Sequence, residues 1–494
     1  MVTVKLSELL EERGMDPAAL KELEIAGLTA DSRDVEPGYL FAALPGAKVD
    51  GRAFLVDAVA RGASAILAPP GTDLDDARAD ANGKVVRLIT DSNPRRRFAL
   101  MAAKFYRNQP NTVAAVTGTN GKTSVAHFTQ QLWQTLGKRS GYMGTLGAWG
   151  GSKKINGSLT TPDPVGVHRV LEDLERAGVT HLAMEASSHG LHQFRIDGVR
   201  IAIAGFTNLS QDHLDYHGSM AAYLAAKLRL FSDVMIEGGT AVLNADAPEF
   251  LAFDAACRLR RHRVLSFGES GDAIRLDDVT REAAAQKLKL TVFGQSFDVR
   301  LPLTGRFQAS NAMCALGLVL ASGADPKAAV TALASLHGVS GRLEHVGDSA
   351  AGAPVYVDYA HTPDALETVL AALRPHASGK LVVVFGCGGD RDKGKRRLMG
   401  EKAKEHADLI FVTDDNPRTE PAATIRREIL QGCPDATEIG DRELAIQTAI
   451  AALNAGDVLL IAGKGHENGQ VVGTNVIPFN DADVARDQLT RSPS

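Results

Sequence analysis

Short apolar runs of β-forming residues alternate along this chain with stretches rich in Ala, Leu and Arg that suit helices. The clearest runs, each followed by a glycine-rich or polar loop, cover residues 113–116, 181–184, 201–206, 381–385, 409–412 and 458–461. Strands that alternate with helices indicate parallel sheets, and such sheets bind ligands beyond the carboxyl ends of their strands. We therefore predict an α/β protein with mostly parallel sheets, whose functional residues follow these runs.

The length of 494 residues allows about three domains of roughly 150 residues each. A polar, proline-containing segment at 90–97 precedes a predicted helix at 98–106, and a Gly-Val-Ser-Gly stretch occupies 338–341. These two segments predict domains at 1–98, 99–337 and 338–494. Within the middle domain, alternating polar and apolar residues over 273–303 predict a small antiparallel excursion.

Charge and cysteine usage limit the partners and the compartment. Lys and Arg number 54 and Asp and Glu 59, so the net charge is −5, which excludes non-specific binding to nucleic acid or an anionic membrane. The four cysteines are far apart and form no Cys-x-x-Cys pair, so we expect reduced, structural thiols. The N-terminus lacks an apolar signal core, and no apolar stretch approaches the roughly 18 residues of a membrane span. We expect a cytoplasmic monomer.

A candidate phosphate-binding loop lies at 113–124, Val-Ala-Ala-Val-Thr-Gly-Thr-Asn-Gly-Lys-Thr-Ser. It is a buried strand that turns through glycines into a helix starting near Lys122. Such a turn directs backbone N–H groups at phosphate oxygens, while Lys122 reaches the terminal phosphates and Thr123 can ligate Mg²⁺. The standard pattern has glycine where this chain has Val116, so a turn without a ligand is the alternative. The flanking strand and helix favour a nucleoside triphosphate.

Acidic and histidine side chains follow two more predicted strands. Glu185 comes directly after 181–184, and the loop 207–218 contains Asp212, His213, Asp215 and His217. In one parallel sheet these loops open at the same edge as the phosphate loop, where carboxylate and imidazole ligands suit Mg²⁺. Solvated surface residues are the alternative. In the predicted helix 220–231, nothing local separates Lys227 from an ordinary surface lysine.

Several motifs together resemble the Mur ligases of peptidoglycan synthesis, and the resemblance runs from Asp31 to Glu467. The motifs cover residues 117–124, 159–164, 185–191, 208–218, 305–311, 340–344, 357–364, 386–391, 415–418 and 462–467. This family implies a first domain for the uridine diphosphate end of a nucleotide-sugar and a central P-loop-type ATPase domain. The third domain is then Rossmann-like and holds the incoming amino acid.

The resemblance also implies ATP-dependent amide-bond formation. The D-glutamate γ-carboxylate of UDP-N-acetylmuramoyl-L-alanyl-D-glutamate is phosphorylated by ATP, and an amine then takes the acyl phosphate. Phosphorylation is needed because a free carboxylate is too poor an electrophile to react with an amine. The implied ATP-binding residues are Gly118, Thr119, Asn120, Gly121, Lys122, Thr123, Ser124, Asn311, Arg342 and Asp358, with His361 beside the last.

Two Mg²⁺ ions are implied as cofactors. Thr123 and Glu185 would hold one, and His213 with the carbamate of Lys227 would hold the other. An ammonium cannot ligate a cation, whereas a carbamate offers anionic oxygens. The catalytic set implied by the resemblance is Lys122, Glu185, His213 and modified Lys227.

The family's contacts to the nucleotide-sugar fall on Ala30, Ser32, Ala47, Lys48, Val49, Thr160, Thr161, Ser187, Gln193 and Arg195. Those to the amino acid fall on Arg391, Asp415, Asn416, Pro417, Arg418, Gly463 and Glu467. Arg195 suits a diphosphate or peptide carboxylate. Arg418 has the planar fork that pairs with a carboxylate, so we expect meso-2,6-diaminopimelate rather than L-lysine, with Glu467 on the distal ammonium.

Three alternatives stay open at this point. The same type of ligase could add L-lysine, or the chain could be a folylpoly-γ-glutamate synthetase, which shares the phosphate loop and the carbamylated lysine. A nucleotide-binding regulatory or scaffold protein is the third alternative. The two predicted metal sites argue against the last, because binding alone rarely requires two metals.

Overall fold

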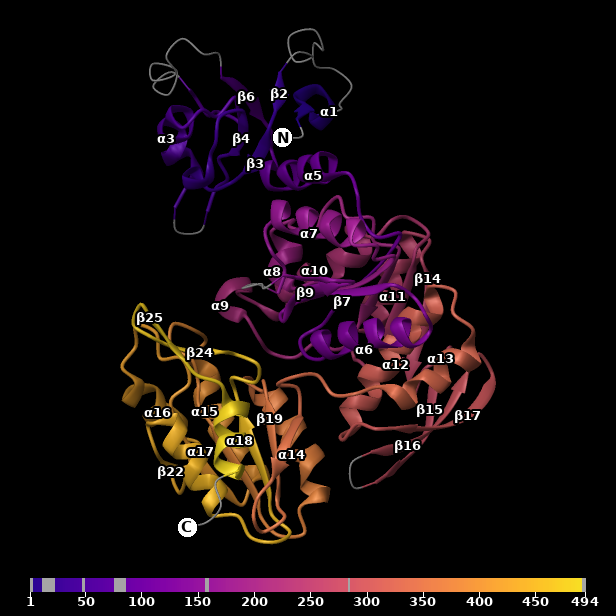
Figure 1. Cartoon of the computed structure of the whole chain (residues 1–494), viewed down its shortest axis with the longest axis vertical. Helices are drawn as coiled ribbons and strands as arrows, with labels where there is room; N and C mark the ends of the chain where they lie inside the picture. Colours follow the sequence, from indigo (N-terminus) through magenta and orange to yellow (C-terminus); the bar gives the residue numbers. More distant parts are fainter. Residues whose placement is uncertain are drawn as a thin grey trace. The chain divides into compact units, whose positions relative to one another are not determined.

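The computed structural model describes residues 3–10, 23–46, 49–74, 86–155, 160–282 and 285–490 (Figure 1). The chain forms two compact units. The first unit comprises residues 1–115, 139–202 and 226–239, and the second comprises 116–138, 203–225 and 240–494.

A small parallel sheet forms the amino-terminal part of the first unit. Its strands, in order, are β3 (Gly27–Thr29), β4 (Tyr39–Ala42), β5 (Ala65–Ala68) and β6 (Arg87–Thr90). Helices α1 (Leu6–Leu10) and α5 (Pro94–Tyr106) pack on one face, and α3 (Leu55–Ala60) packs on the other. Strands β1 (Val4–Lys5) and β2 (Glu24–Ile25) form a separate antiparallel pair.

Helix α5 begins at Pro94, so the predicted start at residue 98 is wrong. Asn93 caps the helix by accepting the Arg96 N–H at 3.1 Å, and proline occupies the first helical turn. Both are favoured at helix starts because they satisfy, or do without, N–H groups that lack an intrahelical acceptor. The polar residues that suggested a linker are the cap and first turn of this helix.

The largest sheet has the strand order β10-β9-β8-β11-β7-β12-β13-β14-β15-β16-β17. The pairs β8–β11, β12–β13, β13–β14 and β14–β15 are parallel, whereas β8–β9–β10 and β15–β16–β17 are antiparallel. The strands are β7 (Thr112–Thr117), β8 (Ser140–Gly144), β9 (Gly147–Gly150), β10 (Lys153–Ile155), β11 (His181–Glu185), β12 (Ile203–Phe206), β13 (Thr240–Asn244), β14 (Arg263–Gly268), β15 (Ile274–Arg281), β16 (Gln286–Val292) and β17 (Gln295–Leu301). The predicted antiparallel excursion over 273–303 is confirmed.

The helices that belong to this sheet follow its strands along the chain. They are α6 (Lys122–Thr135), α7 (Pro164–Arg176), α8 (Ser188–His192), α9 (Leu214–His217), α10 (Met220–Arg229), α11 (Phe250–Leu259), α12 (Arg306–Ala321) and α13 (Pro326–Ala332). In the second unit, α12 packs against α6 and against β12, β13 and β14. A π-helical turn at Leu230–Val234 follows α10.

A third sheet, in the second unit, has the order β18-β19-β23-β20-β21-β22 and is parallel except at β18. Its strands are β18 (Glu344–Asp348), β19 (Pro354–Asp358), β20 (Leu381–Phe385), β21 (Leu409–Val412), β22 (Thr437–Glu438) and β23 (Val458–Ala462). The helices are α14 (Pro363–Leu373), α15 (Gly394–His406), α16 (Ala422–Leu430), α17 (Arg442–Ala451) and α18 (Asp481–Thr490), and β24 (Gly469–Val472) pairs with β25 (Asn475–Pro478).

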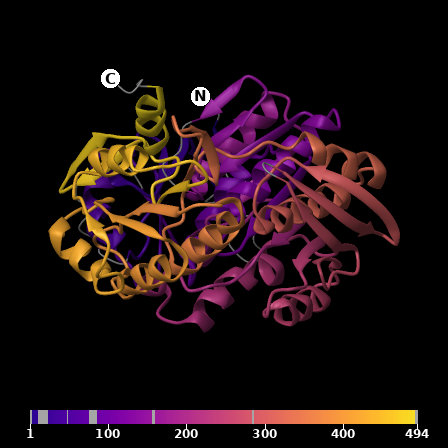
Figure 2. The same ribbon diagram turned by 90° about the horizontal axis from the view of Figure 1, so that it is seen from below.

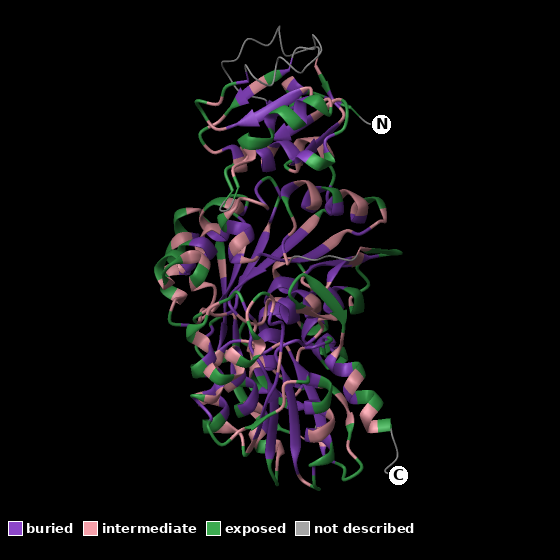
Figure 3. Cartoon of the chain, turned by 90° about the vertical axis from the view of Figure 1, so that its left-hand side faces the viewer, coloured by how far each residue is buried: buried purple, intermediate pink, exposed green. Residues whose placement is uncertain are grey.

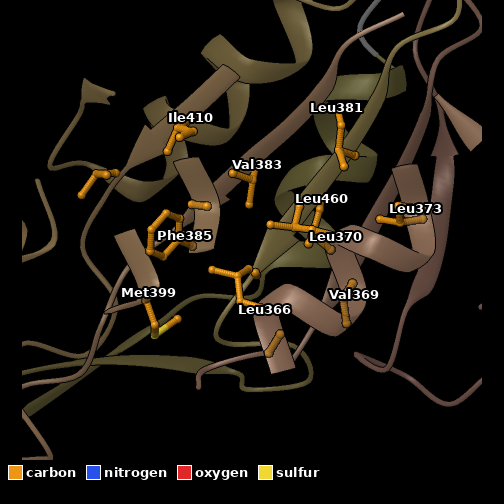
Figure 4. Close-up of a cluster of buried hydrophobic side chains, with 14 of the residues drawn as sticks. Leu366, Val369, Leu370, Leu373, Leu381, Val383, Phe385, Met399, Ile410 and Leu460 are labelled. Atoms are coloured by element: carbon orange, nitrogen blue, oxygen red, sulfur yellow. The ribbon is translucent and has the colours of Figure 1, made fainter. Parts of the chain in front are cut away.

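Two apolar cores lie on opposite faces of this third sheet. Leu366, Leu370 and Met399 from α14 and α15 cover Val383 and Leu460 on one face (Figure 4). Residues of α17 and α18 cover the other face, and Figure 2 shows helices on both sides of these strands. Helices on both faces of a mostly parallel sheet are the doubly wound arrangement, so the expected Rossmann-like architecture is present.

The six predicted strands are all present, with small differences at their ends. Those at 381–385 and 409–412 match β20 and β21, whereas β12 starts at Ile203 rather than at residue 201. The central strands are largely buried (Figure 3). All four cysteines are free and buried, and burial raises the pKa of Cys433 to about 11 and that of Cys387 to about 12. None of the helices in the described part of the chain is long and apolar enough to span a membrane.

Candidate active site

The phosphate loop joins β7 to α6. Gly118 and Gly121 have φ angles of +152° and +85°, and a Cβ would lie 1.9 Å from Thr207 Oγ1 at the first and 2.4 Å from Asn311 Oδ1 at the second. Only glycine fits such positions without displacing its neighbours. The Lys122 ammonium turns back over the loop and donates to the carbonyl oxygens of Gly118 at 3.0 Å and Thr119 at 2.7 Å.

The loop after β12 holds the phosphate loop in this shape. Asn208 accepts the Thr119 N–H on its backbone oxygen and the Asn120 N–H on its side-chain oxygen, each at 2.9 Å. These two N–H groups therefore brace the loop. The backbone N–H groups of residues 122–124, in the first turn of α6, have no acceptor within the helix, and N–H groups in this position suit a phosphate.

His213 and Asp212 lie in the same wrapping loop. His213 has a φ of +53°, uncommon for a residue other than glycine, and its Nε2 lies 3.3 Å from Asp212 Oδ2. Burial alone would raise the pKa of Asp212, but the cationic forms of His361, His213, Lys395 and Lys122 together lower it. Asp212 thus keeps its negative charge at a point where several basic side chains converge.

Side chains from the carboxyl-terminal part of the second unit reach the phosphate loop. Arg342 Nη2 donates to Thr123 Oγ1 at 3.0 Å, and Asn120 Nδ2 donates to Asp364 Oδ2 at 3.0 Å. Asp358 is buried and accepts the N–H groups of Leu343 (2.6 Å) and Ala360 (2.7 Å), while burial raises its pKa to about 6. Asp358 therefore shapes the backbone around Arg342. Burial lowers the pKa of His361 to about 4.

Glu185 ends β11 and is 1% exposed. Its Oε1 accepts the Tyr142 hydroxyl at 2.5 Å and the Thr145 N–H at 2.9 Å, and its Oε2 accepts the Thr145 hydroxyl at 3.1 Å. These bonds fix the orientation of the buried carboxylate. An oriented, oxygen-rich site of this kind fits Mg²⁺.

Five of the predicted nucleotide-sugar residues form one hydrogen-bond network with Glu185 in the first unit. Thr160 bonds Thr145 at 3.0 Å, and Thr161 donates to the Glu185 backbone oxygen at 3.3 Å. Ser187 donates to Thr161 from its backbone and its hydroxyl, and Arg195 bonds both the Thr161 carbonyl (2.7 Å) and Gln193 Oε1. These side chains thus form one polar network beside Glu185.

The remaining nucleotide-sugar candidates lie in the amino-terminal part of the first unit. Ala30 and Ser32 follow β3 at its carboxyl end, where Ser32 is buried and Ala30 is exposed. Val49 is exposed, and Ala47 and Lys48 lie outside the described residues.

Lys227 lies in α10 and is 1% exposed. The reading of a surface lysine is therefore wrong. An ammonium group is costly to bury unless it is paired. The burial places Lys227 away from the exposed surface, as the carbamate implied by the family resemblance requires.

The predicted amino-acid residues converge at the carboxyl ends of β20, β21 and β23. Arg418 is half-buried, with a φ of +53°, and its guanidinium donates to the Gly389 carbonyl at 2.8 Å. Burial and the nearby Arg391 guanidinium lower the pKa of Arg418. Two arginines that disfavour each other's charge are suited to share an anion such as a carboxylate. Gly463 leaves room for Asp415, whose Oδ2 would lie 2.8 Å from a Cβ at this position.

Asn416 and Glu467 contact each other at the same strand ends. Asn416 Nδ2 donates to Glu467 Oε2 at 2.8 Å, and the fully buried Lys464 donates to both side chains at 3.0 Å. Lys464 lies in the motif at 462–467, but the motif predicts no role for it. The sequence signal for a role of Lys464 is its position between Gly463 and Glu467, which are two predicted ligand residues.

One further cluster has the composition of a metal site. Glu367, Glu405 and His406 lie together on α14 and α15. Lys402 donates to Glu367 at 2.9 Å and to Glu405 at 3.1 Å. The cluster is therefore an ion-pair network between two helices.

A loop with two glycines precedes helix α6, and the chain is built on mostly parallel sheets. These features are typical of nucleotide-binding α/β proteins, and the sheet from β18 to β23 adds a doubly wound domain. Family models match residues 24–106 (Mur ligase family, catalytic domain), 116–319 (Mur ligase middle domain) and 341–465 (Mur ligase, glutamate ligase domain). The chain belongs to the Mur ligase family, as the motifs predict.

Curated relatives and solved structures agree with this assignment. The chain is 50% identical to the UDP-N-acetylmuramoyl-L-alanyl-D-glutamate–2,6-diaminopimelate ligase of Bradyrhizobium diazoefficiens, over 97% of both chains, and 51% identical to that of Caulobacter vibrioides, again over 97% of both. A solved structure of a ligase with this name is 34% identical, with a TM-score of 0.70 and 99% coverage of both chains. Folylpolyglutamate synthase from Mycobacterium tuberculosis shares the fold at 21% identity and a TM-score of 0.65, with 82% of this chain and 95% of that one covered.

Proposed function

We propose that this enzyme adds meso-2,6-diaminopimelate to the D-glutamate γ-carboxylate of UDP-N-acetylmuramoyl-L-alanyl-D-glutamate, with ATP as co-substrate. The observation that carries the proposal is the identity of about half of all positions, over 97% of both chains, with diaminopimelate ligases. The paired Arg391 and Arg418 supply the anion site that this amino acid needs. The proposed setting is a cytoplasmic monomer that makes peptidoglycan precursors.

The reaction has two steps. An oxygen of the γ-carboxylate attacks the γ-phosphorus of ATP, the bond to the ADP oxygen breaks, and an acyl phosphate forms. The amino group of diaminopimelate then attacks the acyl carbon, the bond to phosphate breaks, and the amine loses a proton. The first turn of α6 and Lys122 neutralise the charge that develops on the phosphates.

Magnesium supplies further positive charge at the phosphates when it is bound. Thr123 and Glu185 would hold one ion, and His213 with the carbamate of Lys227 would hold a second. The fixed carboxylate of Glu185 and the burial of Lys227 support this assignment.

The nucleotide-sugar would lie along the surface formed by Thr160, Thr161, Ser187, Gln193 and Arg195. Arg195 is anchored to Thr161 and Gln193, so its guanidinium is held in place for an anionic group. Ala30, Ser32 and the loop at 47–49 are proposed to hold the uridine end.

Diaminopimelate differs from lysine by one distal carboxylate, so discrimination needs a group that requires an anion. The half-buried Arg418 is that group. A site built to bond a substrate group rejects the analogue that lacks it by roughly 10⁴-fold or more, because the site's own polar group is left unpaired.

Phosphate release tests the proposal. Purified enzyme should release phosphate from ATP only when the UDP-linked dipeptide and meso-diaminopimelate are both present, and mass spectrometry should detect the UDP-linked tripeptide. Substituting L-lysine for diaminopimelate is the matched control. Comparable kcat/KM values for the two amino acids would overturn the proposed specificity, and phosphate release with neither substrate would overturn the ligase assignment.

A further inference from the structure

The Lys464 side chain is fully buried between two residues of the proposed amino-acid site. Its ammonium donates to Asn416 Oδ1 at 3.0 Å, to Glu467 Oε2 at 3.0 Å and to the Gly469 carbonyl at 2.7 Å. An ammonium has three N–H donors, so these acceptors satisfy all of them. Lys464 is therefore committed to the protein and offers no donor to a substrate.

Lys464 also fixes which way the Asn416 amide faces. The Asn416 oxygen accepts from Lys464 and from the Val471 N–H at 2.9 Å, so the amide nitrogen must face Glu467. Reversing the amide would place its N–H₂ group against two donors. The nitrogen has one more N–H, and Glu467 has its Oε1 atom, to present to a ligand.

Charged side chains of both signs surround this site. Arg418 feels the positive charge of Arg391 and the negative charges of Asp390, Asp415 and Glu467, and Lys464 lies against Glu467. Within this set, Lys464 is the cation that a 3.0 Å contact pairs directly with Glu467. Nearby, Arg442 and Asp481 form a buried pair that adds no net charge.

We infer that Lys464 is a specificity-determining residue that acts through Glu467: by cancelling the carboxylate's charge, it keeps the site from attracting a side chain that carries only an ammonium. The distal end of diaminopimelate bears a carboxylate and an ammonium and is neutral overall, so it does not depend on an uncompensated negative charge at Glu467, which Lys464 offsets at 3.0 Å. The end of lysine is a bare cation. This inference rests on the proposed function and explains how Glu467 can receive an ammonium without favouring lysine.

Removing the positive charge of Lys464 tests its effect on Glu467. In Lys464→Met, Glu467 keeps its charge without its partner, so the site gains one net negative charge. L-Lysine, measured as a competitive inhibitor against diaminopimelate, should bind about tenfold or more tightly than to the parent, since unit charges a few Å apart interact strongly at a protein site. The KM for ATP should stay within about threefold. Structural damage to the pocket would raise the inhibition constant for L-lysine, whereas the charge effect would lower it.

The control is Lys404→Met, which removes an exposed lysine of α15 that lies 3.7 Å from Asp435. It should leave both amino-acid constants unchanged. The inference is overturned if the inhibition constant for L-lysine in Lys464→Met is equal to or higher than the parent value while the KM for ATP is preserved.

A second pair of variants serves if Lys464→Met does not fold. Glu467→Gln leaves Lys464 unbalanced and should weaken L-lysine binding about tenfold, and adding Lys464→Met to it should recover at least fivefold of that loss. Failure to recover also overturns the inference. Failure of the parent to use diaminopimelate at all would instead refute the proposed function, so the two outcomes are distinguishable.

Discussion

Breaking the buried ion pair between Arg442 and Asp481 should cost more stability than any exposed pair. Both side chains are fully buried, and Arg442 donates to the two Asp481 oxygens at 2.7 Å each and to the Ala462 carbonyl at 2.9 Å. Asp481→Asn keeps the shape but leaves the guanidinium charged and without its counter-ion. Such a change costs about 3–5 kcal/mol, or roughly 6–20 °C in the melting temperature of a domain of about 150 residues.

Scanning calorimetry combined with hydrogen exchange is the assay, because exchange at the β23 amides identifies the transition that moves. Asp31→Asn is the matched control: it breaks the pair with Arg33, whose side chain is 81% exposed, and should cost about 0–1 kcal/mol. The double variant Arg442→Met/Asp481→Leu should recover most of the lost stability, because no buried charge remains. A shift in Asp481→Asn no larger than that in Asp31→Asn would refute the reasoning.

Three further predictions concern the site and its titration. Arg418→Ala should lose most activity with diaminopimelate while the Kd for ATP, measured by calorimetry, stays unchanged; a matching loss of ATP binding would contradict this. Lys227→Ala should be nearly inactive and partly restored by a small carboxylic acid in the buffer, whereas parental activity in this variant would exclude a carbamate role. Burial lowers the pKa of His168 to about 4, so only the unfolded chain takes up this proton between pH 6.5 and 4, and stability should fall as the pH falls through that window by about 3 kcal/mol for this residue. Urea titrations of His168→Asn should show a smaller fall, and an equal fall would count against the assignment.

The strand-end motifs could be located from the sequence because a parallel sheet brings the ends of its strands to one edge. Apolar runs marked β11, β20 and β23, and the glycines marked the turn after β7. The start of α5 was misplaced because arginines in its first turn resemble a linker, while the cap at Asn93 depends on a single side chain. Helix ends are set by such individual bonds.

The partners of the site residues could not be predicted, because they come from distant segments. Tyr142 reaches Glu185 over a separation of 43 residues, Lys464 reaches Asn416 over 48, and Arg442 reaches Asp481 over 39. A motif shows that Glu185 or Asn416 lies at a strand end. Which side chain orients it depends on packing between elements, and no local pattern in the sequence records that packing.

A chain of contacts in the second unit links the phosphate loop to the amino-acid site. Arg342 bonds Thr123, and its neighbour Gly341 lies so close to the segment after Lys464 that a Cβ there would be 2.3 Å from the His466 N atom. Glu467 is the next residue. Arg342 and Gly341 thus connect the phosphate loop with the backbone that carries Glu467. We therefore expect a nucleotide at Thr123 to change the affinity for the amino acid, and calorimetry that finds equal amino-acid affinity with and without nucleotide would contradict this expectation.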